Sequence, residues 1–99
     1  MNKQDKLILL FDYYGDLLSE SQRNYFESYY FDNLSLSEIS ENYSVSRNAI
    51  SKDLKLVSEK LNNFEDKLGL IKKDDKLRKI ISKVKDNDLK EKLLNILDE

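Results

Sequence analysis

Apolar residues recur three or four positions apart along most of this 99-residue chain, the spacing of one face of an α-helix. The first run predicts a helix over Lys3–Leu18, with these residues on its apolar face: Leu7, Leu10, Phe11, Tyr14, Leu17 and Leu18. There is no proline, and glycine occurs only at Gly15 and Gly69. The pattern and the composition together predict an all-α fold.

A second helix is expected after Ser19 or Ser21, either of which can serve as its N-cap, and it should end at Asp32-Asn33. Aromatic residues one helical turn apart form a stripe along it: Tyr25, Phe26, Tyr29 and Tyr30. Such a stripe can stack nucleobases, but aromatic side chains at helical spacing more often form core. We expect core, with Leu34, Leu36 and Ile39 packing under the rings.

The next segment predicts a helix-turn-helix. Ser35 and Glu38 form a capping box, in which each side chain satisfies a backbone N–H at the start of a short helix running to about Asn42. The helical periodicity breaks at Tyr43-Ser44-Val45, and Ser46 is a suitable N-cap for a second helix. In such motifs the first turns of the second helix enter the major groove of DNA. Two amphipathic helices joined by a short turn also occur as a plain helical hairpin.

Five polar or basic residues near the start of that second helix are the candidate nucleic-acid-binding residues: Arg47, Asn48, Ser51, Lys52 and Lys55. Their spacing places them on the side of the helix away from Ile50, Leu54 and Val57. We expect Arg47 and Asn48 nearest the base edges, and Lys52 and Lys55 on phosphates.

The same helix should continue to Leu68, because its apolar residues keep a heptad spacing of 4, 3, 4, 3 and 4: Ile50, Leu54, Val57, Leu61, Phe64 and Leu68. Gly69 then provides a C-terminal stop. The distal half of this seam needs cover, either from the first helix of the same chain or from a second copy. A homodimer would pair through Val57, Leu61, Phe64 and Leu68, whereas cover within the chain is the slightly favoured alternative.

After Gly69 the chain predicts a helical hairpin over residues 70–99. Asp74 or Asp75 should cap its first helix, and the run Asp86-Asn87-Asp88 should turn the chain into its second. We expect one domain over residues 1–99, with N-terminal helices in 1–33, the helix-turn-helix in 34–68 and this hairpin in 70–99.

Charge is distributed unevenly although the net charge is only −2. Residues 1–45 carry three basic and eight acidic side chains, whereas residues 46–99 carry fourteen basic and eleven acidic ones. The sign changes where the candidate binding helix begins. Its basic side could meet phosphates, while the acidic half stays away or meets a basic protein.

Composition excludes many functions. The chain has no cysteine and no histidine, so disulfides, Cys/His metal sites and nucleophiles that depend on histidine cannot form. The carboxylates of Asp12, Asp16 and Glu20 lie on a solvated face without a partner group nearby in sequence. We expect no enzyme, no cofactor and no metal. The apolar run Leu7–Phe11 is too short for a signal peptide or a membrane span, which predicts a cytoplasmic protein.

The run LSLSEISENYSVSRNAISKDLKLVSEKL resembles region 4 of bacterial sigma factors, except that Ser44 stands where glycine is usual in the turn. Together with the upstream run LFDYYGDLLSESQRNYFESYYFDNLSLSEIS, it is similar to the YlxM family of small bacterial helix-turn-helix proteins over about Leu7–Leu70. This resemblance implies a part in the signal recognition particle pathway.

Two functions follow from these observations. The protein could be a DNA-binding regulator, with weak affinity for DNA or RNA on its own. Alternatively, it could be an accessory factor that binds the signal recognition particle or its GTPase without binding DNA.

Overall fold

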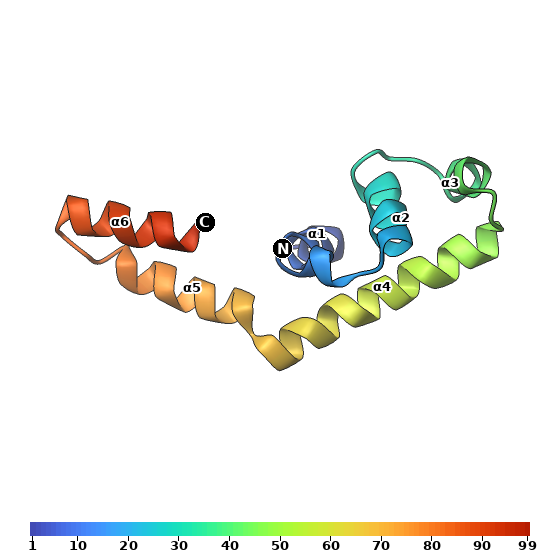
Figure 1. Ribbon diagram of the computed structural model, residues 1–99. Coiled ribbons are helices and arrows are strands. Elements are labelled where there is room, and N and C mark those ends of the chain that lie inside the picture. The colour runs from blue at the N-terminus through green and yellow to red at the C-terminus, as the bar shows by residue number, and fades with distance from the viewer. The chain divides into compact units, whose positions relative to one another are not determined.

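A computed structural model describes residues 1–99 and is entirely helical apart from its connections (Figure 1). The elements in chain order are α1 (Lys3–Tyr14), the 3₁₀ turn η1 (Gly15–Leu17), α2 (Glu20–Tyr30), α3 (Leu36–Tyr43), α4 (Arg47–Leu68), α5 (Leu70–Ile81) and α6 (Asn87–Leu97). The predicted all-α class is confirmed. The chain divides into two compact units, Met1–Lys67 and Leu68–Glu99. The expectation of one domain over the whole chain stays a prediction.

The first helix is shorter than the expected Lys3–Leu18. It ends at Tyr14, and Gly15 begins a single 3₁₀ turn that closes with the backbone N–H of Leu18 donating to the carbonyl of Gly15 at 3.1 Å. Glycine favours this change of winding because its backbone is costly to hold in a helix. The tighter turn lets the side chain of Leu18 enter the core, where it is 6% exposed.

Helix α2 is capped at Ser19, one of the two N-caps expected, and the cap is reciprocal. Its hydroxyl accepts a hydrogen bond from the backbone N–H of Gln22 at 3.2 Å, while the Gln22 side-chain carbonyl accepts from the Ser19 N–H at 3.3 Å. The aromatic stripe of this helix is only partly core. Tyr25 and Phe26 are buried, whereas Tyr29 is 39% exposed and Tyr30 half-buried. The expected burial of the stripe therefore holds for its first pair.

Helices α1, α2 and α3 stand along one side of the long helix α4 (Figure 1). Val57 and Leu61 of α4 are fully buried. The ring of Tyr14 in α1 packs against Phe64, with centroids 6.0 Å apart. The seam is thus covered within the chain, which was the favoured alternative. Val57 and Leu61, two of the four residues expected to pair in a homodimer, are buried within the chain, whereas Leu68 is 54% exposed. The homodimer through Val57, Leu61, Phe64 and Leu68 stays a prediction.

The unit Leu68–Glu99 is a hairpin of α5 and α6. Gly69 has φ +62°, and α5 begins directly after it at Leu70. The expected caps Asp74 and Asp75 are therefore wrong, because the left-handed glycine both ends α4 and starts the next helix. The run Asp86-Asn87-Asp88 turns the chain into α6, as expected. The Asp86 carboxylate caps this helix by accepting hydrogen bonds from the backbone N–H groups of Asp88 and Leu89, at 3.0 and 3.2 Å.

One ion-pair cluster links the two helices of the hairpin. The guanidinium of Arg78 lies 2.6 Å from the carboxylate of Asp98 and 3.4 Å from that of Asp74. Ile81 is buried, but the apolar face stays largely open, with Ile80 65% and Ile96 62% exposed. No helix in the protein is both long and apolar enough to span a membrane.

Candidate nucleic-acid interface

The helix-turn-helix consists of α3, the three residues Ser44–Ser46, and α4. Its first helix begins with the expected capping box. The hydroxyl of Ser35 accepts from the Glu38 N–H at 3.1 Å, and the Glu38 carboxylate accepts from the Ser35 N–H at 3.0 Å. This backbone hydrogen bond holds the pKa of Glu38 below its ordinary value. The carboxylate therefore stays negative at the entry to the motif.

Ser44 makes the turn in the position where glycine is usual. Its φ of 54° and ψ of 42° are left-handed, a conformation that costs energy for a residue with a Cβ. The turn is held by the Val45 N–H, which donates to the carbonyl of Ser40 at 3.1 Å, and by the Ser40 hydroxyl, which donates back to the Val45 carbonyl. Ser40 is thus a residue of the turn that the sequence pattern did not single out.

A small apolar cluster fixes the angle between the two helices. Its buried members are Tyr25 of α2, Ile39 of α3 and Ile50 of α4, and four half-buried residues pack against them: Leu34, Leu36, Val45 and Leu54. The ring of Tyr25 also meets Tyr43 edge to face, with centroids 5.2 Å apart. Since each helix contributes a fully packed side chain, the start of α4 is held rigidly.

The cap expected at Ser46 is confirmed, because its hydroxyl accepts a hydrogen bond from the Ala49 N–H at 3.1 Å. The helix starts at Arg47, so the five candidate residues occupy its first three turns: Arg47, Asn48, Ser51, Lys52 and Lys55. All five are exposed. No ion pair engages Arg47, Lys52 or Lys55. Their charges are therefore available to a ligand, whereas Asp53 on the same helix is half-buried.

The five candidates do not all face the same surroundings. Ser51 and Lys55 line a groove of about 250 Å³ that α1, α2 and α3 complete, which we call the tyrosine groove. Its other lining residues are Lys3, Leu7, Tyr29, Tyr30, Leu36, Leu54 and Ser58. Arg47, Asn48 and Lys52 lie outside this lining. The aromatic stripe was the sequence signal for the groove, whereas nothing in the pattern placed Lys3 beside it.

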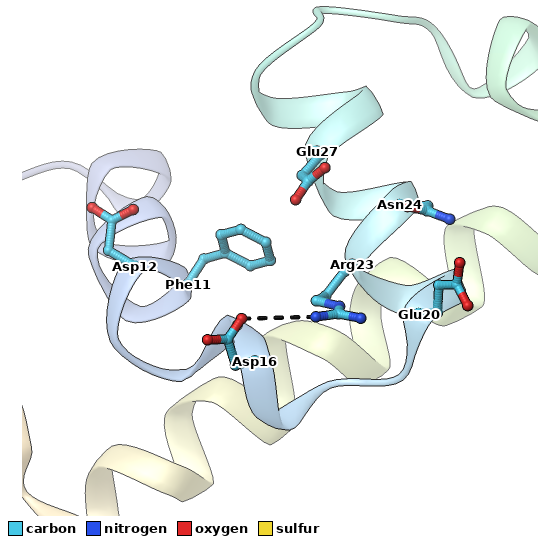
Figure 2. A pocket seen from close by; sticks show the side chains of 8 residues that line it. Phe11, Asp12, Asp16, Glu20, Arg23, Asn24 and Glu27 are labelled. Atoms are coloured by element: carbon cyan, nitrogen blue, oxygen red, sulfur yellow. Dashed lines mark ion pairs between the residues drawn. The ribbon is translucent and has the colours of Figure 1, made fainter.

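A second hollow, of about 390 Å³, lies between α1 and α2 and is acidic. Figure 2 shows Asp16 and Arg23 turned toward each other, and their charged groups are 3.7 Å apart. Three further carboxylates line the hollow, those of Asp12, Glu20 and Glu27. No group of three carboxylates in the protein converges to hold a metal ion. This hollow would repel phosphate, so an anionic ligand is directed away from it.

The unit that contains the motif has eight basic and twelve acidic residues, a net charge of −4. Three of the eight cations, Arg47, Lys52 and Lys55, belong to the exposed face of α4. A fourth, Lys3, borders the tyrosine groove. Half of the positive charge of an acidic unit is therefore concentrated around the start of α4.

Comparisons with known proteins agree with this geometry. A family model described as "UPF0122: Putative helix-turn-helix protein, YlxM / p13 like" matches residues 1–99. A UPF0122 protein of Desulforamulus reducens is 49% identical over 73 residues, which cover 74% of this chain and 62% of that protein. A relative from Geobacillus kaustophilus is 41% identical over 86 residues, 87% of this chain and 78% of its own. One from Listeria welshimeri is 40% identical over 97 residues, 98% of this chain and 86% of its own.

Proposed function

Because this chain belongs to the YlxM/p13-like family of helix-turn-helix proteins, we propose that it is a DNA-binding regulatory protein that acts through the start of α4. Arg47 and Asn48 would approach base edges, and Lys52 and Lys55 would contact phosphates. Ser51 would add a hydrogen bond between these two sets. The helix α3 would cross the DNA backbone, as the first helix of such motifs does.

One observation carries the proposal: the three cations at the start of α4 are exposed and free of ion pairs in a unit that is otherwise acidic. Cations on a solvated surface of no function would more often be interleaved with carboxylates, as Lys79 and Asp75 are in α5, 3.0 Å apart. The rigid seating of α4 by Ile39 and Ile50 adds the fixed geometry that reading base edges requires.

Few phosphate contacts imply weak and strongly salt-dependent binding. Three cations would give a slope of about −3 in a plot of log affinity against log salt concentration, and non-specific dissociation constants of about 10⁻⁴ to 10⁻⁶ M. Fluorescence anisotropy with a labelled duplex at several salt concentrations measures both quantities. The triple variant Arg47→Ala, Lys52→Ala, Lys55→Ala should abolish duplex binding and leave the melting temperature nearly unchanged, because no core contact is lost.

A matched control removes the same charge elsewhere in the unit. Lys6, Lys60 and Lys67 are exposed and lie outside the candidate face. Changing these three lysines to alanine should lower duplex affinity only slightly, through the net charge. Equal losses in the two triple variants would show that only the overall charge matters, and the proposed site would be wrong.

The acidic character of the unit favours a second candidate function. The unit has a net charge of −4, and half of its cations lie near the start of α4. The rest of its surface is therefore strongly acidic and could bind a basic protein instead. The YlxM resemblance suggests that this partner would be the signal recognition particle or its GTPase. Sedimentation with purified particle, with and without nuclease, tests this candidate. A complex that survives nuclease, in a protein that binds no duplex, would favour the accessory function over DNA binding.

A further inference from the structure

The tyrosine groove has features that a duplex-binding surface does not need. Two neighbouring tyrosines line it, and their rings stand nearly perpendicular, at 80° with centroids 5.0 Å apart. Tyr30 is anchored from behind by Phe26, whose ring centroid is 4.4 Å away. Tyr29 remains 39% exposed, although it is large and aromatic. The pair therefore offers aromatic surface at a fixed place beside the start of α4.

Cations border this aromatic surface on two elements. Lys3 comes from the first turn of α1 and Lys55 from the third turn of α4, and neither takes part in an ion pair. The hydroxyls of Ser51 and Ser58 add hydrogen-bonding groups on the α4 side. An aromatic surface flanked by cations and hydroxyls matches the chemistry of a nucleotide, in which a flat base is joined to a negative phosphate.

A neighbouring hollow indicates which end of the tyrosine groove would hold the phosphate of such a ligand. Tyr29 and Tyr30 also line a hollow that extends to Glu38, whose carboxylate is held negative by its hydrogen bond to the Ser35 N–H. A phosphate would be repelled at that end and attracted at the end with Lys3 and Lys55. The volume of the tyrosine groove, about 250 Å³, is below the range of about 300–1,000 Å³ typical of pockets for drug-sized ligands. One small flat group fits it better than a folded ligand.

We propose that the tyrosine groove binds an unpaired nucleotide, with its base stacked on the exposed ring of Tyr29, the ring of Tyr30 against the edge of the base, and its phosphate between Lys3 and Lys55. The ligand class of the protein then includes single-stranded DNA or RNA, or a duplex with an extruded base. This inference rests on the proposed function in that Ser51 and Lys55 belong to both surfaces. An acidic peptide could also meet the two lysines, but it would leave the aromatic pair without a flat partner.

Anisotropy with labelled oligothymidylate and oligouridylate of about ten nucleotides tests the groove. Tyr29→Ala should weaken single-strand binding about five- to 150-fold, the range for one stacked base, and leave the affinity for a duplex unchanged. Tyr29→Phe keeps the ring and should restore single-strand binding. Tyr13→Ala, which removes a tyrosine of similar exposure outside the groove, is the matched control. The DNA and RNA oligomers together distinguish the two sources of an unpaired nucleotide.

Intrinsic fluorescence gives a second measurement, because the protein has six tyrosines and no tryptophan. Bound oligonucleotide should quench part of this emission in the wild type, and less of it in Tyr29→Ala. If Tyr29→Ala unfolds, the single-strand affinity of Lys3→Glu tests the groove instead. Lys6→Glu, a change of an exposed lysine in the same helix, is its control. Lys3→Glu should weaken single-strand binding several-fold more than Lys6→Glu, and it should reduce the salt slope by about 0.7.

Several results would overturn the inference: no single-strand binding by the wild type, equal effects of Tyr29→Ala and Tyr13→Ala, or displacement of the oligonucleotide by polyglutamate at an equal concentration of charge. The last would show that the groove attracts anions without using the rings. Loss of duplex binding in Arg47→Ala/Lys52→Ala tests the proposed function separately, because neither residue lines the groove. Single-strand binding that depends on Tyr29 in a protein without duplex affinity would retain the groove and reject the duplex interface.

Discussion

The hydroxyl of Tyr14 donates a hydrogen bond to the carboxylate of Glu65, which lies 51 positions later in the chain, at 2.5 Å. Tyr14 is 1% exposed, and its ring also packs against Phe64 on the same turn of α4. A polar contact and an aromatic contact therefore fasten the end of α1 to the distal half of α4. The heptad seam of α4 is long enough to suggest a dimer. The attachment of α1 explains how residues of the same chain cover it.

Loss of that hydroxyl should destabilise the unit modestly. A hydrogen bond to a charged group contributes about 1.5–3 kcal/mol, and the lower end applies here because Glu65 is only half-buried and water can solvate it. Chemical denaturation of Tyr14→Phe, Glu65→Gln and the double variant gives the coupling energy between the two residues. Tyr29→Phe, which removes a hydroxyl that makes no hydrogen bond within the protein, should be neutral; a coupling near zero would contradict the prediction.

Truncation within the α4 seam should be costly for the isolated chain. Leu61 is fully buried, so Leu61→Ala should lower the free energy of unfolding by about 2–5 kcal/mol. Leu68 belongs to the same heptad pattern but is 54% exposed, and Leu68→Ala should change stability little. Urea denaturation with light scattering checks both. If Leu61→Ala instead converted a dimer into a folded monomer of unchanged stability, cover within the chain would be the wrong description.

Glycine at the turn should stabilise the helix-turn-helix. Ser44 is left-handed at φ 54°, and removing its Cβ relieves that strain, so Ser44→Gly should raise stability by about 0.5–1 kcal/mol. Ser37 is exposed within α3, where glycine only adds freedom to the unfolded chain. Ser37→Gly should therefore lower stability by about 0.5–1 kcal/mol. Thermal denaturation of the two variants should shift in opposite directions; shifts of the same sign would count against strain at Ser44.

Acid should weaken the capping box of α3. The hydrogen bond from the Ser35 N–H lowers the pKa of Glu38 from its ordinary 4.5, so the folded state favours the ionised carboxylate. This contribution is present above pH 4.5 and is lost as the pH falls through the lowered pKa. Glu38→Gln keeps an acceptor, as Gln22 does in the box of α2, but cannot titrate. The melting-temperature advantage of the wild type over Glu38→Gln should shrink between pH 7 and pH 3; a constant difference would contradict this prediction.

Local signals in the sequence were enough to predict most of the elements. The capping box at Ser35, the N-caps at Ser19 and Ser46 and the stop at Gly69 all depend on hydrogen bonds or backbone conformations within a few residues, so their residue types identify them. For the same reason, the exposure of Arg47, Asn48, Ser51, Lys52 and Lys55 follows from helical periodicity. Whether these five residues bind nucleic acid stays a prediction.

Relationships between distant segments were decided only by the tertiary structure. The heptad seam permitted either a second copy or the same chain as its cover, because periodicity identifies an apolar face and not its partner. The contacts of Tyr14 with Phe64 and Glu65 show that the same chain covers part of this seam, and pairing with a second copy stays a prediction. The aromatic stripe likewise could not reveal which rings are buried. Packing of Phe26 against Phe11, with centroids 4.3 Å apart, fills the core and leaves Tyr29 at the surface, where Lys3 and Lys55 complete a groove assembled from four helices.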